Sequence, residues 1–161
     1  MWRVLAMIGG VSGAAGLSQF PEFSQQYLQR LAGKVDALAA VVADFDASAT
    51  RNNLTRDQAL AELAGTPFLI DRQADMRRNV ADHKRLSDDL TRLRDATPLE
   101  RLTMPQRLGD AETLAAAWAD FRPAIPATVD GAVSAGVGYM AGWGLLAGLW
   151  ALLTWPFRRR A

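Results

Sequence analysis

Two long segments without a charged residue lie near the ends of this chain, and every acidic residue lies between them. The first runs from Val4 to Pro21 behind Arg3, and the second runs from Gly131 to Phe157 ahead of three arginines. An α-helix rises about 1.5 Å per residue, so about 20 apolar residues span the hydrocarbon core of a bilayer. The pattern predicts an all-α protein in which N- and C-terminal transmembrane helices flank a small extramembrane antiparallel helical bundle.

The charges and prolines set the predicted boundaries. We expect transmembrane helix 1 at residues 3–20, a helical domain at 21–128, transmembrane helix 2 at 129–157 and a basic tail at 158–161. Four of the 18 basic residues flank the spans, which leaves 14 against 17 acidic residues in between. This mildly acidic balance argues against nucleic acid as a partner, because nucleic acid selects dense basic patches. The absence of cysteine excludes disulfides and thiolate metal sites.

The arginines also predict the orientation in the membrane. Arg3 and the final three arginines lie at the outer ends of the spans, whereas Arg122 is the one basic residue close to a span on the inner side. Basic residues beside a span favour the cytoplasm, so we expect both termini there and the middle domain in the periplasm of a Gram-negative cell. Trp2 and Trp155 would then lie at the same cytoplasmic interface.

Small residues recur at intervals of three and four in both segments, which places them on one face of each helix. They are Ala6, Gly9, Gly13 and Gly16 in the first segment and Gly131, Ala135, Gly138 and Gly142 in the second. Such faces let helix backbones approach closely in lipid, so we expect them to form the packing interface of an antiparallel pair. The alternative is that small residues are simply common in membrane helices.

The first segment has a second interpretation. A basic start, a short apolar stretch and the small residues Ala14-Ala15-Gly16 also fit a secretory signal peptide with its cleavage site. The small-residue face favours a retained anchor, because a signal peptide has no need of that register.

The region between the spans has helical periodicity. Apolar residues spaced by three and four predict a coiled-coil-like helix from about Pro21 to about Asp46. They are Leu28, Leu31, Val35, Leu38, Val42 and Phe45. Thr55 with Gln58 is a capping-box pattern that opens a short helix stopping at Gly65.

Thr66 is expected to cap a longer helix at about 67–95. Its apolar stripe consists of Leu69, Met76, Val80, His83, Leu86, Leu90 and Leu93. On the other side, an aspartate is followed three residues later by an arginine at Asp75 and Arg78, Asp82 and Arg85, and Asp89 and Arg92. These spacings predict ion pairs on a solvated face, or alternatively a docking strip for a partner.

Two shorter elements complete the predicted bundle. Thr97 with Glu100 is another capping pattern. A helix is expected from Asp110, with Leu114, Trp118 and Phe121 as its apolar face.

No cluster in the chain has the composition of an active site. His83 is the single histidine, and its place in an apolar stripe is typical of a partly buried structural residue. The paired acids Asp88-Asp89 lack the Glu-x-x-His elements of a metal site in a helical bundle. We therefore expect no catalytic residues, no metal and no cofactor, and hence no enzyme.

Several stretches of the sequence resemble one family along nearly the whole chain. They are Leu17–Gly33 with its Gln-Phe-Pro-Glu-Phe element, Asp44–Ser48, Asn53–Ala59 and Trp155–Arg159. The chain resembles a family of small proteobacterial inner-membrane proteins catalogued only as a domain of unknown function. The resemblance implies a Gram-negative inner-membrane location and brings no catalytic residues.

These features predict a non-enzymatic integral membrane protein. The expected role is an accessory, scaffold or assembly subunit that contacts membrane lipid and binds another membrane protein or complex, or a second copy of itself. The alternative is a periplasm-facing sensory module that holds a lipid or small molecule in a cavity lined by Leu38, Val42, Met76 and Leu90.

Overall fold

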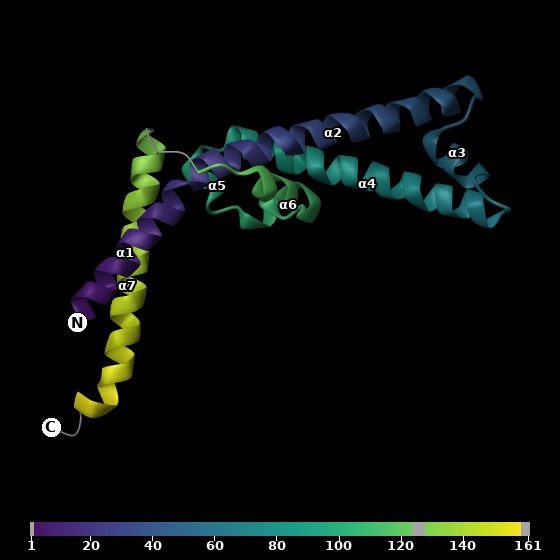
Figure 1. Ribbon diagram of the computed structural model, residues 1–161. Coiled ribbons are helices and arrows are strands. Elements are labelled where there is room, and N and C mark those ends of the chain that lie inside the picture. Colours follow the sequence, from purple (N-terminus) through teal and green to yellow (C-terminus); the bar gives the residue numbers. More distant parts are fainter. Residues whose placement is uncertain (1, 124–127, 159–161) are drawn as a thin grey trace. The chain divides into compact units, whose positions relative to one another are not determined.

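The computed structural model describes residues 2–123 and 128–158, and every regular element in these ranges is a helix, as predicted. The elements are α1 (Trp2–Ser18), α2 (Phe20–Arg51), α3 (Arg56–Glu62), α4 (Pro67–Asp95), α5 (Pro98–Arg101), the 3-10 helix η1 (Pro105–Leu108), α6 (Ala111–Asp120) and α7 (Val129–Arg158) (Figure 1). They form two compact units. The second unit consists of Tyr27–Asp95 and Gln106–Ala116, and the first contains α1, the start of α2, α5, the end of α6 and α7.

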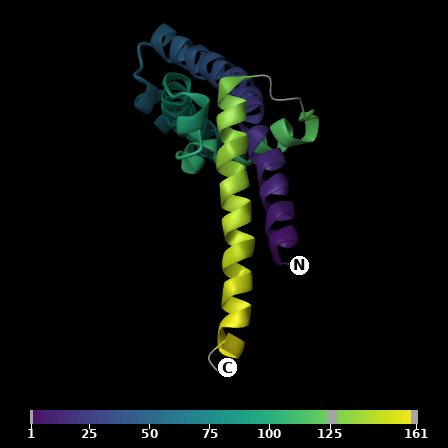
Figure 2. The same cartoon turned by 90° about the vertical axis from the view of Figure 1, so that its left-hand side faces the viewer.

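In the first unit, α1 and α7 lie side by side and run antiparallel (Figure 1, Figure 2). Two helical stretches among the described residues are long and apolar enough to cross a membrane, one starting at Trp2 and one at Val129–Thr154. In the most apolar 18-residue stretch of each, only 17% and 6% is buried. The core helix of a soluble protein would be mostly buried. The pair therefore has the surface expected of helices that face lipid.

The apolar side chains of this pair point outward. The exposed large ones include Val4, Ile8, Val11, Val137, Met140, Leu145, Leu149, Leu152 and Leu153. The predicted interfacial side chain of Trp155 and the basic tail fall outside the described side chains. Pro21 lies in the first turn of α2, as predicted.

The second unit is a helical hairpin in which α2 and α4 are close at one end and spread apart toward the other, where α3 is part of the connection between them (Figure 1). Four positions of the predicted α2 stripe are buried, namely Leu28, Leu31, Val35 and Val42. From α4, the side chains of Leu86, Leu90 and Leu93 are buried. These leucines and valines provide the apolar burial that stabilises the hairpin, at about 25 cal/mol per Å² removed from water.

The predicted end of α2 at about Asp46 is wrong, because the helix continues to Arg51. The Thr50 hydroxyl donates to the Asp46 carbonyl at 2.8 Å, and Ser48 bonds back to its own helix in the same way. Their side chains thus bond within the helix and do not interrupt it. The chain leaves the helix only near Asn53, whose φ of 57° is left-handed.

Three predicted helix starts are confirmed. Thr55 and Gln58 form a complete capping box before α3, and Thr97 and Glu100 form one before α5. Thr66 accepts a hydrogen bond from the Leu69 amide at the start of α4, at 3.3 Å. Each cap satisfies backbone donors that lack a partner inside the helix.

The predicted apolar face of α6 is wrong. Trp118 is 71% exposed and Leu114 is 39% exposed, while Thr113 and Ala117 are buried. The reason is a polar anchor: Asp110 caps the helix and accepts hydrogen bonds from Thr113. This contact turns Thr113 inward and leaves the larger apolar side chains outside.

Candidate functional site: a helix-packing face and a polar cluster

The contact between α1 and α7 is made by glycine backbones. A Cβ added to Gly13 would lie 3.0 Å from the Gly138 carbonyl carbon and still closer to its oxygen. A Cβ added to Gly138 would lie 2.7 Å from the Gly13 carbonyl carbon, and one on Gly142 would lie 2.8 Å from that of Gly9. Real Cβ atoms do not come this close to backbone atoms, so only glycine fits these four positions without a shift of the helices.

Larger side chains pack beside these glycines. The Tyr139 ring would lie 2.6 Å from a Cβ on Gly10, and the Leu17 Cβ would lie 2.9 Å from one on Gly138. Gly10, Leu17 and Tyr139 were not among the predicted interface residues, because the spacing of small residues does not indicate which side chains fill the adjoining space. The close approach and its aromatic flank together make a contact rich in dispersion energy.

The eight predicted interface residues are not all brought together. Ala6 and Gly131 are buried and Ala135 is half-buried. Gly16 is exposed, and a Cβ added there would meet nothing within 4 Å. The step from Gly13 along this face is four residues, to Leu17, so the helix rotation turns Gly16 away from α7.

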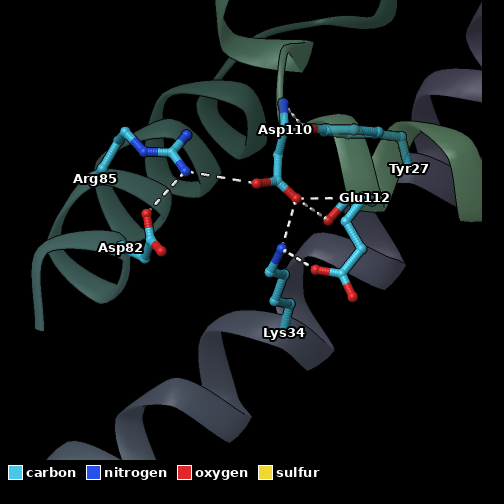
Figure 3. A network of polar contacts seen from close by, with 7 residues as sticks. Tyr27, Lys34, Asp82, Arg85, Asp110 and Glu112 are labelled. Carbon is cyan, nitrogen blue, oxygen red and sulfur yellow. Dashed lines mark hydrogen bonds and ion pairs between the residues drawn. The ribbon is translucent and has the colours of Figure 1, made fainter. Parts of the chain in front are cut away.

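A second feature is the cluster around Asp110 in the second unit (Figure 3). The Asp110 carboxylate is 9% exposed and accepts from the Lys34 ammonium at 2.8 Å and from the Thr113 hydroxyl at 2.6 Å. Arg85 lies 3.5 Å from its other oxygen. The Tyr27 hydroxyl accepts a 3.4 Å hydrogen bond from the Asp110 amide. One side chain thus joins α2, α4 and the start of α6.

The protonation of this cluster follows from its contacts. Burial by itself raises the pKa of the Asp110 carboxyl, but hydrogen bonds from Lys34 and Thr113 outweigh that effect and lower the pKa to about 2. Burial raises the pKa of the Tyr27 hydroxyl. At neutral pH Asp110 is therefore an anion with its partners in place, and it has no proton to exchange.

The ion pairs along α4 follow the predicted pattern at two of three positions. Asp75 pairs with Arg78 and Asp82 with Arg85, as predicted. In place of the expected pair of Asp89 with Arg92, Arg107 of η1 binds Asp88 at 2.7 Å and Asp89 at 2.9 Å. Arg92 lies 3.8 Å from Asp88.

The Arg107 guanidinium lowers the pKa of the Asp88 carboxyl. Arg107 thereby holds η1 against α4, and Asp88 and Asp89 are its ion-pair partners.

A buried arginine belongs to the first unit. Arg101 is 6% exposed, and its guanidinium donates to the Ser24 hydroxyl and to the Gln25 side-chain oxygen, both at 3.4 Å. Burial lowers its pKa. The contacts hold α5 against the start of α2 and were not evident in the sequence, because the partners lie far apart in the chain.

No group of three or more histidine, cysteine, aspartate or glutamate residues in the described part of the chain is arranged to hold a metal ion. His83 is half-buried on α4. The charged clusters of the second unit use their carboxylates to hold helices together.

Comparison with known proteins identifies one family. The model of a family described as "Protein of unknown function (DUF2937)" matches residues 1–159, which is nearly the entire chain. No curated protein and no solved structure matches.

Proposed function

The chain belongs to the DUF2937 family, a family of unknown function, and we propose that it is a non-enzymatic accessory, scaffold or assembly subunit of the bacterial inner membrane. In this proposal α1 and α7 cross the bilayer as a hairpin, and the second unit lies in the periplasm and binds another integral membrane protein or complex. The basic residues at both ends of the chain support this orientation.

The glycine contact supports a retained first span. The backbones of Gly9 and Gly13 fit against those of Gly142 and Gly138. If a peptidase removed residues up to about Gly16, the matching face of α7 would lose its partner. A signal peptide therefore explains the sequence less well than an anchor does.

The observation that carries the partner-binding role is an exposed apolar pair at the start of α4. Phe68 is 69% exposed and Ile70 is 54% exposed. The rest of α4 is rich in charged residues, many of which pair with one another. Large aromatic and aliphatic side chains exposed in the first turn of such a helix can anchor a protein contact, because interface cores are enriched in aromatic residues.

Affinity purification in mild detergent tests this role. The wild-type protein should retain a membrane-protein partner in near-constant ratio, as measured by quantitative mass spectrometry. The double substitution Phe68→Asp and Ile70→Asp should reduce its recovery at least about tenfold, since a loss of about 1.4 kcal/mol weakens binding tenfold. The matched control places Asp at Gln29 and Ala40, two exposed positions on α2.

Two results would count against the proposal. Equal recovery from the Phe68 and Ile70 variant and from the control would exclude this apolar pair as the docking surface. If the wild-type protein retains no partner above background, the accessory role should be abandoned.

A specific observation favours a second candidate, the binding of an amphipathic small molecule. A groove of about 430 Å³ is lined by the apolar residues Leu60, Val80 and Ala81 and by charged residues of which three are basic and one acidic, namely Arg56, Arg77, Lys84 and Asp57. This groove is not the predicted cavity, because none of the four residues expected to line that cavity lines it. Two of them, Val42 and Leu90, are buried in the core of the second unit. A lipid or apolar anion that co-purifies with the protein and is lost in the Val80→Asp variant would support this function over the first.

A further inference from the structure

An aromatic cluster in the first unit has an open outer surface. Phe23 lies edge-on to Trp118 and to Phe121, with ring centroids 5.8 and 5.6 Å apart. Trp118 and Phe121 stack with centroids 6.3 Å apart. Phe23 and Phe121 are half-buried, whereas Trp118 is 71% exposed. The two phenylalanines hold the indole in a defined position while most of its surface has no contact among the described residues.

The register of α1 and α7 locates this cluster along the helix pair. Gly9 faces Gly142 and Gly13 faces Gly138. Each step along α1 is therefore matched by one in the opposite direction along α7, and Ser18 lies about level with Val133. The first charges beyond these positions are Glu22 on α2 and Asp130 on α7, so both helices reach the edge of their apolar stretch together.

Phe23 follows Glu22 directly, so the cluster lies at that edge. Phe23 is the fifth residue after Ser18, the last residue of α1, which corresponds to a rise of about 7.5 Å along a helix. The polar interface on each side of a bilayer is about 5–7 Å thick. The exposed Arg122 follows Phe121 and adds a cation at the same place.

We propose that Phe23, Trp118 and Phe121 form an interfacial anchor, in which the Trp118 indole inserts at the boundary between lipid headgroups and acyl chains. The proposal rests on the proposed two-span hairpin, because Trp118 can reach lipid only if α1 and α7 cross the bilayer beside it. A tryptophan combines a large apolar ring with an N–H donor, so its free energy is lowest where apolar and polar surroundings meet. Insertion into lipid would remove the exposed indole surface from water. It would thus cover the part of Trp118 that no described residue of the chain covers.

Two single-tryptophan proteins test the anchor. One retains Trp118 and the other retains Trp143, a residue of α7, with every other tryptophan replaced by phenylalanine. Each full-length protein is placed in phosphatidylcholine vesicles whose lipids carry bromine either near the headgroup or near the chain ends, and iodide is added as an aqueous quencher.

Trp118 fluorescence should be blue-shifted relative to a free indole in buffer, and bromine near the headgroup should quench it more than bromine near the chain ends. Trp143 should show the reverse preference for bromine depth. Replacement of Phe23 by alanine in the Trp118 protein should weaken the headgroup-bromine quenching, because the indole loses its support.

Three results would contradict the proposal, and each has a different meaning. In the first, Trp118 emits like free indole in buffer and is fully quenched by iodide, while Trp143 is still quenched by bromine near the chain ends. In that case the anchor is wrong, but the membrane hairpin of α1 and α7 is supported. A Trp118 signal that neither bromine nor iodide quenches would mean that protein covers the indole, which also overturns the lipid contact. If neither tryptophan responds to bromine, both the anchor and the membrane hairpin are wrong.

Discussion

A single aspartate in the second unit supplies both a helix cap and the ion pairs that join three helices. Asp110 accepts from the Thr113 amide at 3.1 Å and from Lys34 at 2.8 Å. A buried carboxylate is stable only when such donors replace the water it has lost. The side chain of Asp110 therefore determines how α6 begins and which of its faces is buried.

Substitutions at this position should separate the cap from the charge. Asp110→Asn keeps a side-chain acceptor for Thr113 but loses the anion, so we expect it to lower the free energy of unfolding by about 1–3 kcal/mol. Glu112→Gln is the matched control, because Glu112 also contacts Lys34 at 2.8 Å but is 84% exposed, and it should cost about 0.5 kcal/mol or less. Urea unfolding in detergent, followed by circular dichroism, measures both.

The low pKa of Asp110 adds a pH dependence to this prediction. Its pKa is lowered from 3.8 to about 2, so its stabilising effect is complete above about pH 4 and is lost as the pH falls through about 2. The stability difference between wild type and Asp110→Asn should therefore shrink over that interval. A difference that stays constant from about pH 5 to about pH 2 would contradict the proposed ion pairs.

At the scale of helices, the two units are packed in different ways. In the first unit, glycine backbones of α1 and α7 meet directly. In the second unit, the fully buried side chains include Tyr27, Leu31, Leu86 and Leu93. Apolar burial from water holds the second pair, whereas close backbone fit holds the first if it lies in lipid, because lipid tails are as apolar as leucine.

Leucine substitutions on α1 test this difference. Gly13→Leu places a side chain against the Gly138 backbone and should weaken the contact by about 1–3 kcal/mol. Gly16→Leu adds the same side chain on the same helix where nothing lies within 4 Å, and it should cost little. The readout is disulfide formation between Ala6→Cys and Leu145→Cys, which continue the register of Gly9 and Gly142 in a cysteine-free chain.

We expect efficient crosslinking in the parent and in Gly16→Leu, and a several-fold loss in Gly13→Leu. Equal crosslinking in all three proteins would show that these glycines merely reflect the composition of membrane helices.

At the scale of the whole chain, the antiparallel contact of α1 and α7 has a consequence for topology. If both helices span the bilayer, their outer ends must emerge on the same side, and the chain from Phe20 to Thr128 must lie on the other. The arginines then favour the cytoplasm for the two ends.

Cysteine labelling in intact cells tests this topology. A maleimide that crosses the outer but not the inner membrane should label Ser48→Cys, which lies in the second unit, and should not label a cysteine added after Ala161 until the cells are lysed. Labelling of the C-terminal cysteine with protection of Ser48→Cys would reverse the orientation.

N-terminal sequencing of the protein from the same membranes tests whether the first span is retained. The sequence should begin at Met1 or Trp2, whereas a start near Leu17 would establish signal cleavage.

Local patterns in the sequence were enough to predict the main helices, apart from the end of α2, together with three helix starts and the two apolar spans. Thr55 and Gln58, or Thr97 and Glu100, are three residues apart, so their reciprocal hydrogen bonds depend only on the chain between them. The length and hydropathy of a span are likewise properties of one continuous segment.

Only the tertiary structure decided which faces meet. The contacts of Lys34 with Asp110 and of Arg107 with Asp88 join segments that are distant in the sequence, and no local pattern identifies such partners. Spacings of three and four residues left the rotation of α1 open, and contact with α7 selects Leu17 over Gly16. The sequence alone determined where helices form, because that depends on neighbouring residues, whereas their rotation and partners depend on steric fit between distant backbones and side chains.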